Sequence, residues 1–492
     1  MRLICVKLHL DFFKNWNYIY LKMSNKNTTK FYSQNYNPRN KRSVLAFAFK
    51  LRNSTLRGAC KKVKAKINIG NKGGFGTALE KYYFEYKPNS NPAPDFPEIG
   101  LELKSSPLKK SKQNRFLAKE RIVLNMINYK KLINEKFSSC TVIKKNKDLL
   151  FIFYLYEKGK NIWDYKILVV ENWKIPEIDL QIIKKDWNEI KLKVKQGKAH
   201  EISEGDTFYL GACTKSATGN DFTVQPKSKI KAKPRAFSFK QGYINHILAT
   251  IQKKSGDNYG KLIQRKEIAK KSSVEEIVSK KFKKYIGMTI SQIEKNLGIK
   301  LNRSAKNYYS SLTKSILGIE IKKEIEEFEK ANIKIKVVRI KENNLPNEDM
   351  SFPYFKFRDL LNESWAESSF KSVLEQKYLI VFFRKVGNKF IFEKVKFWNM
   401  PYRDIVQAKR VWLRTRKILS NGDIVLGKKG KRRITNFPSK DYNEVAHVRP
   451  HATNSKDTDY LPVKDRKTGL RYFTKQSFWL NNSYIRDEIY LK

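Results

Sequence analysis

Residues 91–107, NPAPDFPEIGLELKSSP, decide the fold because they join a proline-rich arm to an alternating strand. The prolines force an extended turn, and residues 99–105 then alternate between apolar and charged side chains as a strand does. Glu102 and Lys104 fall on one face of this strand, opposite two leucines. Asp95 precedes the strand on the arm and can fold back over the same face. The segment therefore predicts a site where two carboxylates and an ammonium group converge.

These three side chains follow the P-D…E-x-K pattern of metal-dependent nucleases. Two carboxylates hold a hard divalent cation, typically Mg²⁺, which binds a phosphate oxygen and lowers the pKa of the attacking water. Lys104 would orient or help to deprotonate that water, or offset charge on the transition state. The pattern alone is weak, because in a lysine-rich chain the same series arises easily on a solvated strand.

The charge balance favours nucleic acid as the partner. The 492 residues include 102 Lys and Arg against 47 Asp and Glu, a net charge of +55. An AT-rich genome would enrich acidic residues as well as lysine, so composition bias does not explain the excess. A ribosomal or membrane-surface partner is the alternative. A hydrophobic content of 40% excludes disorder throughout, and the length indicates two or three domains.

The cysteines and the apolar runs bear on location. Cys5, Cys60, Cys140 and Cys213 form no CxxC pair, so neither a zinc ribbon nor a disulfide framework is expected. Charged residues interrupt the apolar run in residues 1–23. No stretch of about 18 apolar residues occurs, and we expect a cytoplasmic protein without a membrane span.

The segment NKGGFGTALEKYYFEY (71–86) predicts a glycine-rich turn that enters a helix. Glu80 lies beside the apolar stripe of this helix. The simplest interpretation is a capped amphipathic helix with an exposed Glu80, and the glycines are too few for a nucleotide-binding signature.

Four matches in the same order indicate an internal duplication. In each half a buried strand is followed by a helix that ends at a glycine, Gly197 or Gly422, and then by two further similar segments. The matched pairs are 149–153 with 378–382, 181–196 with 406–421, 208–221 with 444–457, and 236–244 with 477–485. We therefore expect a basic, disordered extension (1–44) and two domains (45–255 and 256–492), joined by a lysine-rich linker around residues 252–276.

Five ordered motifs resemble the MutH family of GATC-directed DNA endonucleases, and most closely its two-domain, Sau-type branch. They are NKGGFGTALE, PDFPEIGLELKSSP, RIVLNMINY (121–129), GKAHEISEG (197–205) and PRAFSFKQGYI (234–244). The resemblance covers residues 45 to 490. It implies an α/β fold of two tandem restriction-endonuclease-like domains, each a mixed central sheet flanked by helices, and a Mg²⁺-dependent phosphodiesterase.

The same resemblance assigns roles to single residues. Asp95, Glu102 and Lys104 match the catalytic trio, with Asp95 and Glu102 as metal ligands. Glu80 matches a further acidic residue of the active site, and Lys72 a basic residue in the turn before it.

The first half also carries candidate DNA contacts. Lys215 occupies the place of the family's R-P-K loop, where it could donate to guanine or simply contact a phosphate. Cys213 stands where the family often has Arg, so this readout is expected to be partial. Arg235 and Ser238 lie in the PRAFSFKQGYI motif, and Ser238 replaces a residue that can be aromatic in the repair enzymes.

In the second half the catalytic pattern is altered, but the base-reading loop is fuller. EFEKANIKIKVV (327–338) aligns with residues 95–106 and places Lys334 opposite Glu102, which removes a metal ligand. Arg449-Pro450-His451 fills the loop, and Trp479 stands opposite Ser238. We therefore expect a second domain that binds DNA and regulates, but does not cleave.

The resemblance implies a type II restriction endonuclease that cuts double-stranded DNA at GATC with Mg²⁺. One active site per chain implies a transient homodimer on DNA, and restriction implies a cognate DNA methyltransferase. The alternatives are a strand-nicking mismatch-repair enzyme of the same family and a non-catalytic DNA-binding protein with a decayed nuclease fold.

Overall fold

A computed structural model shows two compact units in this chain. Unit 1 comprises the described residues up to Asn125 together with Asn134–Leu180, and unit 2 comprises Met126–Ile133 and Gln181–Lys492. The structure describes residues 31, 34–60, 73–89, 91–111, 114–215, 221–252, 258–263 and 272–492. The expected boundary after residue 255 falls inside unit 2, and the division into domains 45–255 and 256–492 stays a prediction.

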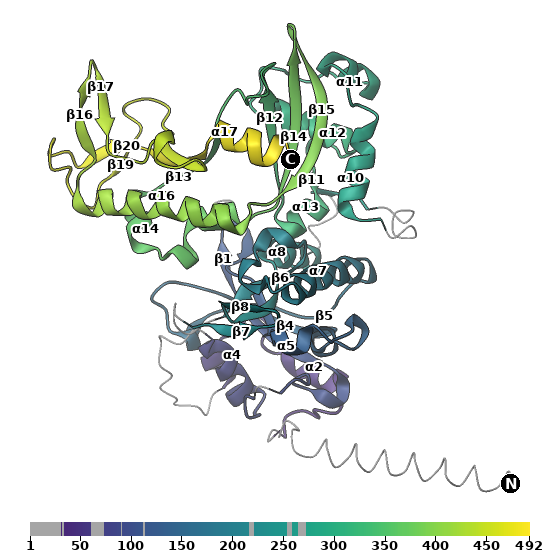
Figure 1. Cartoon of the computed structure of the whole chain (residues 1–492). Coiled ribbons are helices and arrows are strands. Elements are labelled where there is room, and N and C mark those ends of the chain that lie inside the picture. Colours follow the sequence, from purple (N-terminus) through teal and green to yellow (C-terminus); the bar gives the residue numbers. More distant parts are fainter. Residues whose placement is uncertain are drawn as a thin grey trace. The chain divides into compact units, whose positions relative to one another are not determined.

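Unit 1 is built on a mixed four-stranded sheet with the order β2-β1-β4-β5 (Figure 1). β1 and β4 run parallel, whereas β2 and β5 are antiparallel to their neighbours. The strands are β1 (Glu102–Lys110), β2 (Phe116–Ala118), β4 (Asp148–Leu155) and β5 (Ile167–Lys174). Every residue from Leu149 to Phe153 is inaccessible to solvent, as expected for the buried strand predicted there.

Short helices carry apolar side chains into the core against this sheet. They are α2 (Lys41–Phe49), α3 (Leu56–Ala59), α4 (Gly74–Ala78), a π-helical turn (Leu79–Tyr83) and α6 (Thr141–Asn146). Phe75 and Leu79 belong to the same buried cluster as Leu103 and Leu150. The predicted glycine-rich entry into a helix is therefore present, and it packs against the strand that carries Glu102 and Lys104.

The disordered extension predicted for residues 1–44 is too long at its C-terminal end. Tyr36 is buried, and its hydroxyl donates to the Phe84 carbonyl at 2.6 Å. Aromatic packing thus anchors this segment, and α2 begins directly after it at Lys41. Residues 1–30 lie outside the described residues.

The first part of unit 2 contains two antiparallel strand pairs and three helices. β6 pairs with β9, and β7 pairs with β8. The elements are α5 (Tyr129–Leu132), α7 (Glu177–Lys195), β6 (Leu210–Thr214), β7 (Thr223–Gln225), β8 (Ser228–Ala232), β9 (Arg235–Phe239) and α8 (Gln241–Ile251). β3 (Ile122–Met126) and α7 each span a boundary between the units in the sequence.

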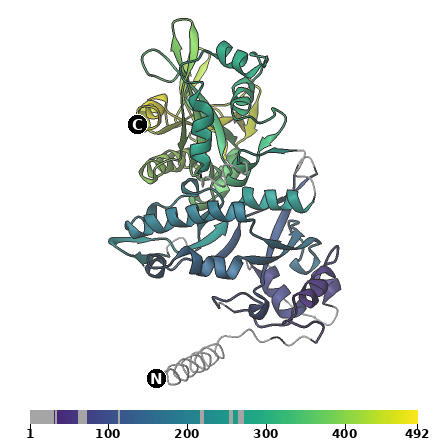
Figure 2. The same cartoon turned by 90° about the vertical axis from the view of Figure 1, so that its right-hand side faces the viewer.

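A three-stranded sheet with the order β12-β14-β15 forms the middle of unit 2. β12 (Lys334–Ile340) runs parallel to β14 (Tyr378–Val386), which is antiparallel to β15 (Lys389–Trp398). Three helices lie beside it (Figures 1 and 2): α10 (Val274–Lys283), α11 (Ile290–Leu297) and α12 (Tyr308–Ile316). α13 (Glu326–Ala331) immediately precedes β12 and packs against α8.

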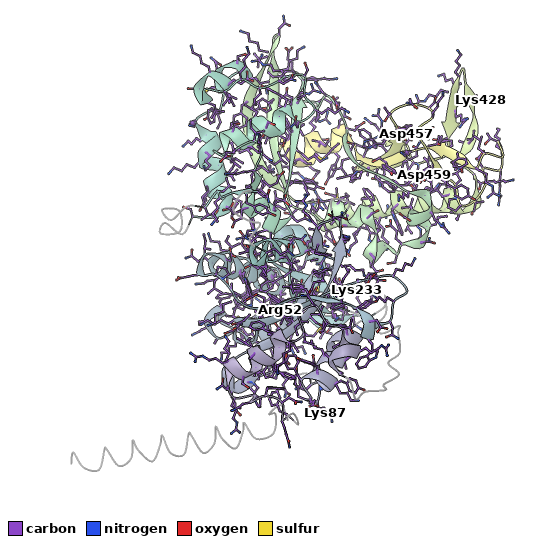
Figure 3. The ribbon with its side chains drawn as sticks, turned by 180° about the vertical axis from the view of Figure 1, so that it is seen from behind. Arg52, Lys87, Lys233, Lys428, Asp457 and Asp459 are labelled. Carbon is purple, nitrogen blue, oxygen red and sulfur yellow. The ribbon has the colours of Figure 1, made fainter. Side chains whose placement is uncertain are left out.

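The rest of unit 2 combines a third sheet with a long helix and two hairpins. The sheet has the order β13-β21-β18. Its strands are β13 (Met350–Phe355), β18 (Ala446–Pro450) and β21 (Gln476–Leu480). The hairpins are β16 (Val425–Lys429) with β17 (Arg432–Thr435) and β19 (Thr458–Tyr460) with β20 (Tyr472–Thr474). The helices are α14 (Phe357–Asn362), α15 (Ser369–Leu374), α16 (Tyr402–Asn421), α17 (Asn482–Tyr484) and a final π-helical turn (Ile485–Tyr490). Figure 3 shows Lys428 at the outer end of its hairpin.

The two helices predicted before Gly197 and Gly422 are α7 and α16. Both glycines adopt a left-handed backbone, with φ of +75° and +71°. A side chain would also strike a backbone oxygen there, at 2.6 Å for Gly197 and 2.3 Å for Gly422. Glycine therefore ends both helices for the same steric reason.

The linker predicted around residues 252–276 is partly packed structure. β10 (Tyr259–Gly260) pairs with β11 (Glu324–Ile325), and Leu262 and Ile263 are buried. Apolar residues inside the lysine-rich segment account for this packing. Within the described ranges, no helix is long and apolar enough to cross a membrane.

Candidate active site

A tight hairpin places Asp95 over the start of β1. Phe96 and Leu101 exchange two backbone hydrogen bonds, of 2.9 and 3.2 Å, around a 3₁₀ turn at Pro97–Ile99. Gly100 completes the reversal with φ of +63°, a conformation that glycine adopts without steric cost. The strand consequently begins at Glu102 and not at Ile99 as the alternating pattern predicted.

Glu102 and Asp95 are connected directly by this hairpin. The Asp95 amide donates to Glu102 Oε2 at 3.0 Å, and the Leu103 amide donates to Asp95 Oδ2 at 2.9 Å. Glu102 is only 2% exposed. The structure therefore brings together the two carboxylates that were predicted to converge.

Lys104 completes the trio on the same face of β1. Its Nζ lies 2.6 Å from Glu102 Oε1 and 3.4 Å from the Leu124 carbonyl oxygen. Leu103, between the two charged residues, points into the core of unit 1. Strand alternation thus gives one face to packing and the other to the charged site.

Glu80 belongs to the same electrostatic cluster. It lies in the π-helical turn that follows α4, and such turns are frequent at functional sites. Gly76, on the helix before it, packs so closely on β1 that a side chain would come within 3.1 Å of Ser105 Oγ. The glycine-rich turn therefore allows this helix to approach β1, the strand that carries Glu102 and Lys104. Lys72 lies outside the described residues.

Two further side chains, which sequence reasoning missed, belong to this site. Lys145, on α6, lies 3.6 Å from Glu102 Oε1 and donates to the Asn91 carbonyl at 2.9 Å. Tyr86 is 1% exposed, and its buried hydroxyl has no hydrogen-bond partner among the described residues. The position of Lys145, just before the strand that pairs with β1, was the available signal.

Burial and the neighbouring carboxylates raise the pKa values of Asp95 and Glu80. Burial is the main cause for Asp95, and the charges of Glu102 and Glu80 raise its pKa further. Burial, then Glu102, raises the pKa of Glu80 to about 7. Neighbouring carboxylates thus disfavour the charged forms of Asp95 and Glu80, and their oxygens are hard donors suited to a cation.

This donor set suits a divalent metal ion that also binds substrate, and it does not form a closed metal cage. Among the described residues, no three His, Cys, Asp or Glu side chains are arranged to hold a metal ion by themselves. Mg²⁺ commonly binds one or two carboxylates together with substrate phosphates and water. Asp95 and Glu102 would hold such an ion, with the remaining positions open to substrate.

The predicted DNA contacts of the first half are only partly accessible. Lys215 is exposed and follows β6, and its amide donates to the Pro234 carbonyl at 2.8 Å. Arg235 Nη1 donates to the Ala212 carbonyl at 2.7 Å, which uses part of the guanidinium to hold β6. Lys215 therefore stays the better candidate for contact with DNA.

The DNA contact predicted for Ser238 stays a prediction, and the structure shows this residue buried. Ser238 pairs with Gly211 in the β6–β9 ladder and is 0% exposed. Both neighbours of Ser238 in β9 are buried as well, so both faces of the strand are covered. Its hydroxyl cannot reach a groove without rearrangement of the strand.

The three DNA-binding candidates of the second half lie together. The Arg449 guanidinium is 4.7 Å from the Trp479 ring centroid, and the His451 ring is 5.5 Å from it. Asp349, whose side chain is 4% exposed, lies 3.2 Å from Arg449 Nη1 and 2.6 Å from Lys440 Nζ. Arg449 itself is 52% exposed and is thus presented at the surface on an aromatic support.

Comparison with known proteins identifies the family. The protein-family model described as DNA mismatch repair enzyme MutH matches residues 84–186. This segment includes Asp95, Glu102, Lys104 and Lys145. The chain is 37% identical over 456 residues to the type II restriction enzyme Sau3AI of Staphylococcus aureus, covering 85% of this chain and 92% of that enzyme. The chain belongs to the MutH-like, Sau-type family of type II restriction endonucleases. The mixed α/β unit 1 therefore contains the restriction-endonuclease-like core of this family.

Proposed function

We propose that this MutH-like restriction endonuclease hydrolyses phosphodiester bonds of double-stranded DNA at GATC sites, with Mg²⁺ as the cofactor. The observation that carries the proposal is the convergence of Asp95, Glu102 and Lys104 within the family-matched segment. The net charge of +55 supports a polyanionic substrate.

The residues of unit 1 suggest how the chemistry is divided. Asp95 and Glu102 would hold the cation, which when bound would supply Lewis-acid chemistry toward a phosphate and a water molecule. Lys104, next to Glu102, is placed to orient that water or to offset charge developing on the phosphate oxygens. Lys145 offers a second ammonium near the same Glu102 oxygen, and Glu80 adds a further acidic group to the site.

We further propose that the second half is a degenerate copy of the first. Glu102 pairs with Leu149 and Lys334 with Tyr378, the partners expected from the sequence alignment. In the next ladder, Gly211 pairs with Ser238 as His447 pairs with Trp479. Two ladders in matching register are unexpected for unrelated domains, since a slip of one residue would reverse every side chain.

The copy lacks the groups needed to hold a metal. Glu327, which aligns with Asp95, is 3% exposed and accepts the amides of Leu262 and Ile263 at 2.9 and 2.8 Å. Lys334 replaces Glu102 and is exposed. One carboxylate thus serves the backbone and the other is replaced by a cation, so we propose that this half binds DNA and regulates cleavage.

One active site per chain supports a transient homodimer on DNA for double-strand cleavage. A restriction role further implies a DNA methyltransferase of matching specificity and action in the cytoplasm. The relative Sau3AI, matched over 92% of its length, favours restriction over the nicking activity suggested by the mismatch-repair family model.

The test is digestion of an unmethylated plasmid with Mg²⁺ or with chelator, followed by mapping of the ends. Double-strand breaks at every GATC, only with Mg²⁺, are the expected result. Nicks alone would support the mismatch-repair alternative. Binding without cleavage in any divalent metal would leave the non-catalytic DNA-binding protein.

A further inference from the structure

A cavity in unit 2 lies where the second half carries the counterpart of the active site. Its volume is about 450 Å³, and it is lined by parts of α12 and the loop before it, β12, and the segment that enters β13. Lys336 on β12 lines this cavity. Lys336 pairs with Ile380 as Lys104 pairs with Phe151, so the two lysines hold equivalent positions in their sheets.

Lys336 has lost the carboxylate partner that Lys104 keeps. Its Nζ donates to the Ser351 carbonyl at 3.0 Å, and no described residue forms an ion pair with it. An ammonium group has three donors, so two are left without a hydrogen-bond acceptor among the described residues, and the Phe352 ring centroid lies 5.8 Å from Nζ. Burial lowers the pKa of Lys336, and no charged neighbour offsets this effect. A partly buried, unpaired cation is costly and calls for an anionic oxygen.

The other charged groups of the cavity leave it electropositive. Arg303 pairs with Glu294 at 2.5 Å, and Arg339 pairs with Glu348 at 2.6 Å. The remaining acid, Asp349, lies within 3.2 Å of two cations from elsewhere in unit 2. Lys306 lines the cavity and, among the described residues, has no ion-pair partner. Lys336 and the exposed Lys306 therefore line the cavity without an ion-pair partner among the described residues.

We propose that this cavity binds one backbone phosphate of DNA through Lys336, without a metal ion. This inference rests on the proposed DNA-binding role of the second half and assigns part of that role to the Lys336 ammonium group. The first half neutralises a phosphate with a cation held by carboxylates. The second half has exchanged the carboxylate for lysine and uses fixed ammonium groups at the equivalent place. Free inorganic phosphate has the same oxygen chemistry, so the experiment separates the two sources.

The experiment measures binding of a GATC duplex to the full chain in the presence of chelator. The variants are Lys336→Met, which removes the charge at similar length, Lys336→Arg, which keeps it, and Lys385→Met, a matched control at the exposed end of β14. We expect Lys336→Met to weaken binding about tenfold and to lower the salt slope by about one, with Lys336→Arg near wild type. Lys336→Met should also raise the melting temperature of the free protein, because an unpaired cation is removed.

The decisive step uses duplexes in which single phosphates are replaced by neutral methylphosphonates. At one phosphate position, the methylphosphonate should weaken DNA binding by the wild-type protein about as much as Lys336→Met does. The same methylphosphonate should not change DNA binding by the Lys336→Met variant. Additive effects at every position would overturn the inference. Stabilisation of wild type by inorganic phosphate, together with additive effects on DNA, would show a free-anion site and overturn it as well.

Arg449→Ala separates this inference from the proposed function. If Arg449→Ala weakens DNA binding while Lys336→Met does not, only the phosphate cavity is rejected. If neither variant changes binding, the DNA-binding role of the second half fails as well.

Discussion

The sheets β1-β4-β5 and β12-β14-β15 have the same strand directions and the same register, but their charged faces differ. In the first sheet, Glu102 and Lys104 stand side by side with Asp95 folded above them. In the second, Lys334 and Lys336 hold the two positions on the strand. The framework of strands is thus compatible with either a metal-binding or a cationic surface. Chemistry in this fold depends on a few side chains at one end of a strand, and not on the sheet itself.

The largest expected effect on cleavage comes from Asp95, a carboxylate that lies at the candidate active site of the first sheet. Asp95→Asn should reduce cleavage by at least about 10³-fold, because a metal ligand is lost. The same change should raise the melting temperature of the metal-free protein, since burial and neighbouring carboxylates disfavour the Asp95 charge. Cleavage rates and thermal unfolding in chelator measure the two effects. The matched change Glu327→Gln should leave cleavage unchanged, and a comparable loss of activity there would reject the comparison.

The two long helices offer a comparison of stability within unit 2. Asp186 on α7 accepts the amides of Phe208, Tyr209 and Leu210 at 2.6 to 2.8 Å, and burial raises its pKa to about 6. The aligned residue of α16 is the buried Val411. Asp186→Ala should lower the free energy of unfolding by about 3 kcal/mol, because three buried amides lose their acceptor. Val411→Ala should lower it by only about 1.5 kcal/mol through lost burial. Urea denaturation measures both, and equal losses would contradict this account.

The base-reading loops allow a smaller test of specificity. Arg449→Ala should weaken binding to GATC duplexes by about 1–3 kcal/mol, since a guanidinium can contact guanine through two hydrogen bonds. Lys215→Ala should cost less binding free energy than Arg449→Ala. It should reduce the affinity about equally for all DNA sequences, as expected for a phosphate contact. Fluorescence anisotropy with GATC and scrambled duplexes measures the difference. A sequence-independent loss for Arg449→Ala would remove it from base reading.

The smallest expected difference concerns the glycines that end α7 and α16. Gly197→Ala and Gly422→Ala should each lower the free energy of unfolding by about 2 kcal/mol, because alanine disfavours positive φ. Gly422→Ala should cost more, since its side chain would approach the Lys464 carbonyl oxygen at 2.3 Å, against 2.6 Å from the Lys227 oxygen for Gly197→Ala. The reverse order in urea denaturation would show that backbone relaxation, and not this contact, sets the cost.

Local pattern predicted much of the catalytic hairpin, and long-range packing explains what it missed. The prolines and the alternation around Glu102 were sufficient to place Asp95 over the strand. They did not predict that Pro97–Ile99 forms a 3₁₀ turn, because the apolar Ile99 fits a strand equally well. Lys145 was missed because it is one of many lysines and reaches Glu102 only through the parallel pairing of β1 with β4.

The candidate DNA surface was less accessible to sequence reasoning. Ser238 was assigned by resemblance, but β9 is covered on both faces, and burial on the second face depends on tertiary packing. Trp479 and Arg449, in contrast, lie in strands β21 and β18, whose order and pairing agree with the proposed duplication. The target sequence GATC follows from family resemblance alone, because charge and the catalytic motif indicate only a metal-dependent nuclease.

The central claim, that only the first half cleaves DNA, can be tested most directly with Glu102→Gln and Lys334→Gln in the full chain. Each variant would be incubated with a GATC plasmid under single-turnover conditions in Mg²⁺, and nicked and linear products would be quantified. We predict no nicks or breaks with Glu102→Gln and a wild-type rate with Lys334→Gln. Site-specific cleavage that persists in Glu102→Gln and disappears in Lys334→Gln would place the active site in the second half and contradict the account.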